Sequence, residues 1–187
     1  LERLIAEAAA LPPEHLARAE RLLAAARAAG LTKYNTGRRP PGRPSSPLPR
    51  VLVAGQVADD AALLAGATGS VRDEAGLLAA ARAAFPAAWL VYKPHPDVEA
   101  GLRAGAPPET WAAADEILHG VSADAALAAC DHVVTLTSTL GFEALLRGIP
   151  VTCFGMPFYA GWGLTDDRAP VPPRRSARPS VAALAHA

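Results

Sequence analysis

The chain has 187 residues, a length that indicates one domain with flanking segments. Its 18 lysines and arginines balance 18 aspartates and glutamates, and this net charge of zero excludes a globally basic nucleic-acid-binding protein. The two cysteines, Cys130 and Cys153, lie in no Cys/His cluster, so neither a disulfide framework nor a structural zinc site is expected. Without an apolar run of about 18 residues the sequence predicts no membrane span, and we expect a reducing, cytoplasmic compartment.

The first 30 residues have apolar side chains at helical spacing, interrupted by a Pro-Pro pair. This pattern predicts a helical segment over residues 1–30 with two helices, the second running from Pro13 to Ala29 and ended by Gly30. Residues 31–50 are rich in proline and arginine and are predicted to form a linker. The chain begins at Leu1 with no signal-peptide pattern, and we expect it to be part of a longer protein.

From residue 51 onward, short apolar runs alternate with alanine-rich helical stretches. Strands are predicted at 51–57, 88–93, 116–119, 132–137 and 151–154, and helices at 73–84, 122–129 and 142–147. Because the strands are continuously apolar, helices are expected to cover both faces of a parallel sheet. The sequence therefore predicts an α/β fold with a Rossmann-like domain over residues 51–165. Residues 166–187 are predicted to be an irregular tail with a helix beginning at Ser180.

Two common nucleotide-binding motifs are absent. No GxGxxG follows the first strand, which argues against a dinucleotide cofactor, and no GxxxxGK[ST] occurs, which argues against a P-loop ATPase or kinase. Polar and aromatic side chains instead follow four of the predicted strands. They are Gln56, Asp59 and Asp60; Lys93, His95 and Pro96; Thr137, Ser138, Thr139 and Glu143; and Tyr159 and Trp162. The carboxyl ends of parallel strands meet at one edge of a sheet, so we expect a binding site there.

The polar groups after the second and fourth of these strands each have a structural and a functional interpretation. His95, between two prolines, is either a turn residue held by packing or a rigidly aimed general acid, and Lys93 is either a strand-end residue or an anion partner. The hydroxyls of residues 137–139 suit a helix cap, and the same helix N-terminus suits a phosphate. Glu143 either favours the helix dipole or accepts hydrogen bonds from ribose hydroxyls.

Two further groups are equally open at this point. Asp59 and Asp60 are either an acidic helix start or a source of a catalytic carboxylate, because one carboxylate near a histidine suits glycosyl transfer through an oxocarbenium-like centre. The glycine-rich segment around Tyr159 and Trp162 is either a packed loop or a wall that stacks on a base or a sugar.

Several segments together resemble the KpsC-type capsular polysaccharide biosynthesis proteins, which are retaining β-Kdo glycosyltransferases that use CMP-Kdo. The segments are residues 33–35 (KYN), 51–60 (VLVAGQVADD), 92–98 (YKPHPDV), 135–138 (TLTS), 141–148 (GFEALLRG) and 154–165 (FGMPFYAGWGLT). They follow the order of the family over most of the chain, and the last is the most specific. One departure is the pair Ala61-Ala62 where the family usually has Ala-Ser, which removes a hydroxyl near Asp60.

The resemblance implies that the chain is one half of a GT-B-like enzyme: the CMP-binding C-terminal half of a module whose acceptor domain precedes it. It implies that Asp60 is the nucleophile and that His95 is an acid/base or a phosphate partner. The other implied site residues are Thr137, Ser138 and Thr139 for the phosphate, Glu143 for the ribose, and Gln56, Lys93, Pro96, Tyr159 and Trp162 for the rest of the nucleotide site. CMP-Kdo would be the donor substrate, and neither a metal nor another cofactor is expected.

The resemblance also implies a glycolipid or oligo-Kdo acceptor and no nucleic-acid partner. Peripheral contact with the inner face of a bacterial inner membrane is one interpretation of Arg174, Arg175 and Arg178, and a solvated basic tail is the other. Three competing functions stay open: an inverting CMP-sugar (sialyl-type) transferase, a non-catalytic nucleotide-binding module and an interaction scaffold. The isolated chain is expected to be inactive because half of the cleft would be elsewhere.

Overall fold

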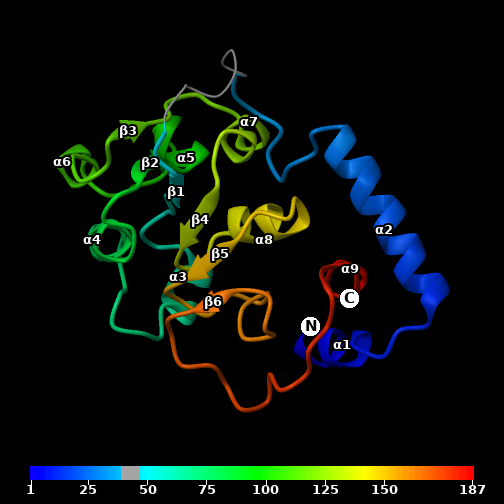
Figure 1. Cartoon of the computed structure of the whole chain (residues 1–187). Coiled ribbons are helices and arrows are strands. Elements are labelled where there is room, and N and C mark those ends of the chain that lie inside the picture. Colours follow the sequence, from blue (N-terminus) through cyan, green and yellow to red (C-terminus); the bar gives the residue numbers. More distant parts are fainter. Residues whose placement is uncertain (39–46) are drawn as a thin grey trace.

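The computed structural model describes residues 1–38 and 47–187 (Figure 1). These residues form a six-stranded sheet in the order β3-β2-β1-β4-β5-β6, and every neighbouring pair is parallel. The strands are β1 (Arg50–Ala54), β2 (Trp89–Lys93), β3 (Glu116–Ile117), β4 (His132–Thr135), β5 (Val151–Cys153) and β6 (Asp166–Asp167). This strand order is that of a Rossmann fold, so the predicted fold class is confirmed.

Helices cover both faces of the sheet. They are α1 (Glu2–Ala8), α2 (Pro13–Ala28), α3 (Ala61–Gly66), α4 (Glu74–Ala84), α5 (Pro96–Glu99), α6 (Pro108–Trp111), α7 (Ala123–Ala128), α8 (Thr139–Leu146) and α9 (Val181–His186). In β1, Leu52 packs with residues of α7 and α8, whereas Val51 and Val53 pack with residues of α3 and α4. Successive strand residues point to opposite faces, so a strand that is buried on both sides is apolar at most of its positions.

The two chain ends pack together on one side of the sheet (Figure 1). Ile5 of α1 is fully buried in the main core, and α2 and α9 join through a smaller cluster of Ala19, Leu23 and Ala182. The carboxylate of Glu2 forms ion pairs with two arginines of the C-terminal tail. The predicted N-terminal helical segment is therefore packed on the Rossmann-like domain.

Most predicted elements lie within a few residues of the observed ones. The helix predicted at 73–84 is α4, whose N-cap Asp73 accepts a hydrogen bond from the Gly76 N–H over 2.8 Å. The helix predicted at 142–147 is longer, because α8 begins at Thr139. The predicted ranges omit α3, α5, α6 and β6, which are short elements. In the predicted linker, residues 39–46 lie outside the described part of the chain, and Arg38 forms a bridge to Val121.

The tail arginines have partners inside the protein. The guanidinium of Arg175 is buried and donates hydrogen bonds to the carbonyls of Pro157 and Ala160 over 2.6 and 2.7 Å. Arg174 pairs with Glu2 at the surface, and Arg178 donates to three backbone carbonyls of residues 175–177. The interpretation of this tail as solvated was therefore wrong for Arg175, because its guanidinium is buried against the loop after β5.

Candidate functional site

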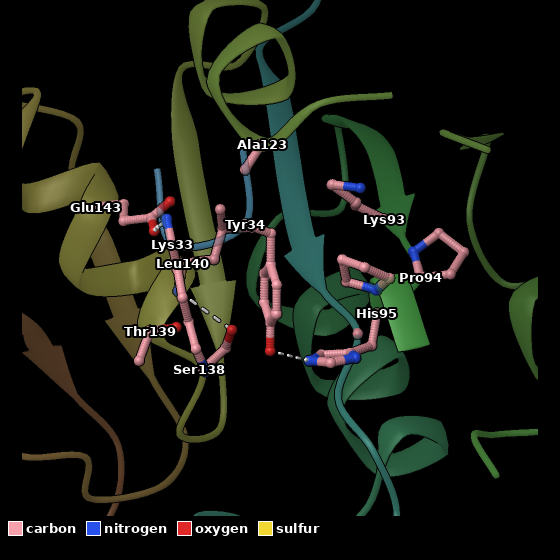
Figure 2. A pocket seen from close by; sticks show the side chains of 12 residues that line it. Lys33, Tyr34, Lys93, Pro94, His95, Ala123, Ser138, Thr139, Leu140 and Glu143 are labelled. Atoms are coloured by element: carbon pink, nitrogen blue, oxygen red, sulfur yellow. Dashed lines mark hydrogen bonds between the residues drawn. The ribbon is translucent and has the colours of Figure 1, made fainter. Parts of the chain in front are cut away.

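The carboxyl ends of β1, β2 and β4 meet at one pocket, next to the point between β1 and β4 where the order of the strands reverses. Parallel sheets bind ligands at such a point. Figure 2 shows the side chains around this pocket. Its lining consists of Lys33, Tyr34, Gly55, Lys93, Pro94, His95, Pro96, Ala123, Ser138, Thr139, Leu140 and Glu143.

His95 is held in a defined orientation by the helix that it precedes. It is the N-cap of α5, and its Nδ1 accepts a hydrogen bond from the Asp97 N–H over 3.1 Å, with Pro96 at the first helical position. Burial lowers the pKa of His95, because it disfavours the imidazolium form. A neutral ring whose Nδ1 is an acceptor carries its proton on Nε2. His95 therefore presents an N–H donor to the pocket.

Lys93 and Glu143 place charged groups in the pocket wall. Lys93 is buried, with its ammonium 3.9 Å from the Glu99 carboxylate, and burial lowers its pKa. Glu143 is also buried, and its Oε1 accepts a hydrogen bond from the Lys33 backbone N–H over 2.7 Å. Within the described residues, Glu143 Oε2 has no hydrogen-bond partner, and burial raises the pKa of this carboxyl. A buried carboxyl oxygen without a partner is suited to a ligand hydroxyl.

The second turn of α8, not the first, contains Glu143, so the helix-dipole interpretation of this residue does not hold. The N-cap of α8 is Ser138, whose hydroxyl accepts from the Leu140 N–H over 3.2 Å. Its own backbone N–H donates to the Thr135 hydroxyl over 3.0 Å. The next residue, Thr139, is exposed at the pocket rim. This helix terminus faces the pocket opposite His95 (Figure 2).

Gln56 and Thr137 lie outside the lining of this pocket and form hydrogen bonds with each other. The Gln56 side-chain amide donates to the Thr137 hydroxyl over 2.8 Å and accepts from the Thr137 backbone N–H over 2.9 Å. Both residues are buried, and neither lines the pocket. Their hydrogen bonds join the ends of β1 and β4, so they fix the position of the two strand ends instead of presenting polar groups to this pocket.

Asp59 and Asp60 differ in their surroundings. The exposed Asp59 forms a 2.6 Å ion pair with Arg103, whose guanidinium lowers the pKa of this carboxyl. Asp60 is half-buried and is the N-cap of α3, where its Oδ1 accepts from the Ala62 N–H over 3.0 Å. Asp60 does not line the pocket, but its negative charge acts on His95 and partly offsets the lowering of the pKa of that ring by burial. The helix-start interpretation therefore holds for Asp60, which lies at the same edge of the sheet as His95.

Tyr159 and Trp162 are not a stacking wall, and this part of the predicted site was wrong. Both side chains are in the core, with 0% and 1% of their surface exposed. The Trp162 indole N–H donates to the carbonyl of Phe158 over 2.8 Å, and the Arg175 guanidinium lies over the Trp162 ring. The glycines that follow Tyr159 let this loop fold back, so the Tyr159 and Trp162 rings point inward and present no face to a base or a sugar.

Sequence reasoning missed Glu74 as part of the support of the site, and it did not assign Lys33 and Tyr34 to the site. The buried carboxylate of Glu74 accepts hydrogen bonds from the Gln56 N–H, the Tyr92 hydroxyl and the Ala106 N–H over 2.7 to 2.9 Å. An acidic residue in a first helical turn gives no signal that it is buried.

A second cavity of about 540 Å³ lies on the other side of Thr139. Its lining includes residues of α3, the loop after β5 and the C-terminal tail.

In residues 1–38 and 47–187, no group of three or more His, Cys, Asp or Glu side chains is arranged to bind a metal ion. None of the helices in the same ranges combines the length and the apolar character needed to cross a lipid bilayer.

Comparison with known proteins places these features in a family. Residues 43–187 match the family model of the capsule polysaccharide biosynthesis proteins. The chain is 44% identical over 168 residues to the lipopolysaccharide-processing protein LpsZ of Rhizobium meliloti, and the match covers 88% of this chain and 38% of LpsZ. It is also 44% identical over 150 residues to the capsule polysaccharide modification protein LipA of Neisseria meningitidis, covering 79% of this chain and 21% of LipA.

Two solved structures of KpsC from Thermosulfurimonas dismutans share the fold. One is a β-Kdo 2,7 transferase with a TM-score of 0.79 and 36% identity, covering 97% of this chain and 54% of that one. The other is a β-Kdo 2,4 transferase with a TM-score of 0.81 and 31% identity, covering 94% of this chain and 55% of that one. The chain thus spans about half the length of these structures and a smaller share of LpsZ and LipA. By these matches, the chain belongs to the capsule polysaccharide biosynthesis protein family.

Proposed function

We propose that this chain is the CMP-binding half of a glycosyltransferase module that transfers Kdo from CMP-Kdo. The observation that carries the proposal is the pocket at the switch point of the sheet. There an imidazole N–H, a buried ammonium, a helix N-terminus and a buried carboxyl oxygen to which no described residue hydrogen-bonds converge. The family and the KpsC structures support the choice of reaction.

Each group has a role in holding CMP. The phosphate would accept a hydrogen bond from His95 Nε2 and lie at the N-terminus of α8, near the Ser138 hydroxyl, with Lys93 supplying positive charge. A ribose hydroxyl would bind Glu143 Oε2, which has no partner in the described protein. The Nδ1 of His95 is occupied by a backbone N–H, so the geometry favours a role as hydrogen-bond donor to the phosphate over a role as general base.

Bond exchange would take place at the anomeric carbon of Kdo. The Asp60 carboxylate would attack this carbon while the bond between the carbon and the phosphate oxygen breaks and CMP departs. The product of this step is a glycosyl ester on Asp60. A hydroxyl of the acceptor would then displace the Asp60 carboxylate, which leaves with the proton of that hydroxyl, so that the two displacements together retain the configuration. The Kdo ring would lie toward the cavity beside α3, the helix that Asp60 caps. Asp59 is less suited to this role, because it is held by Arg103.

The rest of the enzyme would lie outside this chain. We propose that an acceptor domain of the same longer polypeptide faces the carboxyl edge of the sheet, as the greater length of the KpsC structures suggests. A lipid-linked oligo-Kdo acceptor would be used at the cytoplasmic face of the inner membrane. The isolated chain is expected to bind CMP without transferring Kdo.

Intact-protein mass spectrometry tests the covalent step. The longer protein is incubated with CMP-Kdo, and a Kdo adduct is expected at Asp60, with less adduct in a His95→Asn variant, because that variant lacks the hydrogen bond to the departing phosphate. Absence of the adduct in both proteins, together with a product of inverted configuration by NMR, would refute retention. Calorimetric titration of this chain with CMP tests the binding role separately, and a failure to bind CMP would refute the nucleotide site.

A further inference from the structure

Residues 32–35 form a turn that is built from its own side chains. The Thr32 N–H donates to Asn35 Oδ1 over 2.8 Å, and the Asn35 N–H donates to the Thr32 hydroxyl over 3.2 Å. Asn35 has a φ of +47°, in the left-handed region that asparagine tolerates better than most residues. The two residues inside the turn, Lys33 and Tyr34, are thereby presented together.

The turn is bound to α8 by two hydrogen bonds of different kinds. The Lys33 backbone N–H donates to Glu143 Oε1 over 2.7 Å, and the Arg147 guanidinium donates to the Leu31 carbonyl over 2.9 Å. Glu143 belongs to the helix whose N-terminus forms one wall of the pocket, and Arg147 is the C-cap of that helix. The turn is therefore anchored on that wall, although it lies more than a hundred residues away in sequence.

Tyr34 extends from this anchor across the pocket to the opposite wall (Figure 2). Its hydroxyl lies 3.3 Å from His95 Nε2, and the two rings meet edge to face with their centres 5.5 Å apart. Because Nε2 carries the proton of the neutral ring, the Tyr34 oxygen is the acceptor. The Tyr34 hydroxyl thus occupies the place that an anionic ligand oxygen would take at His95.

Lys33 adds a positive charge at the same place. Its ammonium lies 4.9 Å from the centre of the Tyr34 ring, and its charge is close enough to His95 to lower the pKa of that ring. Lys33 lines the pocket together with Lys93. An anion that replaced the Tyr34 hydroxyl at His95 would therefore lie near two lysines, whose charges both act on this ring.

We propose that Lys33 and Tyr34 form a latch over the pocket: the Tyr34 hydroxyl holds His95 when the pocket is empty and yields to a phosphate oxygen, which Lys33 then contacts. This inference rests on the proposed function for the identity of the ligand, CMP. It also extends the site to residues that precede the first strand of the domain. The latch makes binding of a phosphate compete with an internal hydrogen bond.

Three variants test the latch by calorimetric titration with CMP, cytidine and inorganic phosphate. Tyr34→Phe removes the competing hydroxyl and is expected to bind CMP about threefold more tightly, because a net hydrogen bond of ordinary strength is lost from the empty state only. Lys33→Met is expected to bind CMP about tenfold more weakly and cytidine equally well, because only the phosphate contact is removed. Arg3→Met, a change at a distant exposed cation, is the control and is expected to have no effect.

The outcomes separate the latch from the proposed function. If the wild-type chain binds CMP but Tyr34→Phe binds it equally or more weakly, the latch is wrong and the CMP site stands. If the wild-type chain binds phosphate but not CMP, with the same opposite changes in the two variants, the latch stands and the CMP assignment is wrong. Binding of neither ligand overturns both. In every case, the NMR signal of His95 Nε2–H reports whether Tyr34→Phe disturbs this ring in the empty protein.

Discussion

The hydroxyl of Tyr159 donates a hydrogen bond to the backbone carbonyl of Ser138 over 2.5 Å, from a side chain with no exposed surface. Because Ser138 is the N-cap of α8, this contact fixes the helix terminus at which we place the phosphate. The same side chain also leaves no room for a larger residue at position 141, because a Cβ on Gly141 would lie 2.2 Å from the Tyr159 hydroxyl oxygen. The loop after β5 therefore supports the pocket from below.

We expect Gly141→Ala to destabilise the fold, although alanine favours a helix more than glycine does. The added methyl group overlaps the Tyr159 hydroxyl, and overpacking of this kind costs about 1 to 3 kcal/mol. Urea denaturation followed by circular dichroism measures the loss. Adding Tyr159→Phe removes the nearest atom, so the double variant should lose less stability than the sum of the two single variants. Strict additivity would show that the two residues are not coupled.

Two substitutions of His95 should separate its structural role from its binding role. Asparagine is a good N-cap, so His95→Asn is expected to keep α5 and the stability of the protein, whereas His95→Ala should lose about 1 kcal/mol. Both variants lack the Nε2–H donor and are expected to bind CMP about 10 to 100 times more weakly, the effect of a lost hydrogen bond to a charged group. Thermal melting and calorimetry give the two quantities. Unchanged CMP affinity in His95→Asn would contradict the phosphate contact.

Gln56→Ala tests the link between the ends of β1 and β4. The substitution leaves the buried Thr137 backbone N–H without its acceptor, which is expected to cost about 1 to 3 kcal/mol of stability. Thr137→Val is the matched change on the other side, because it keeps that N–H bonded and removes only the hydroxyl. Urea denaturation should show the larger loss for Gln56→Ala. Equal losses would mean that the backbone hydrogen bond contributes little.

The stability of the protein should fall as the pH falls below about 6.5. Burial lowers the pKa of both His95 and His132 below the ordinary value of 6.5, so the unfolded chain binds these protons first. The part of the folding stability that depends on both rings being neutral is therefore fully present above pH 6.5. It is lost as the pH falls through the folded-state pKa values. Melting temperatures between pH 5 and 8 give the slope. The double variant His95→Asn/His132→Asn should show a smaller slope, and an unchanged slope would assign the effect to other groups.

The pattern of apolar residues was enough to predict the architecture. Continuous apolar strands such as the one at residues 51–54 imply a sheet buried on both faces, and the alternation with helices implies parallel strands. From this topology alone it follows that residues after β1, β2 and β4 share one edge. The sequence therefore predicted that Lys93, His95, Ser138 and Glu143 lie close together, and the pocket contains all four.

Local sequence did not determine the direction in which each side chain at that edge points. Tyr159 and Gln56 follow strand ends just as His95 does. Nevertheless, Tyr159 points into the core, and the Gln56 side chain hydrogen-bonds Thr137. These outcomes depend on partners 21 and 81 residues away. No periodic pattern records such contacts, because it describes burial by face and not the pairing of individual hydrogen bonds.

The sequence by itself thus determined the layers of the protein, the order of its main elements and the edge at which polar groups gather, because hydrophobic periodicity and strand direction are local or topological properties. Only the tertiary structure decided which of those groups line the pocket, which of them support it from below, and that Lys33 and Tyr34 cross it. The physical reason is that burial, hydrogen-bond pairing and charge proximity are set by contacts between distant segments, and the energy of each depends on the complete packed environment.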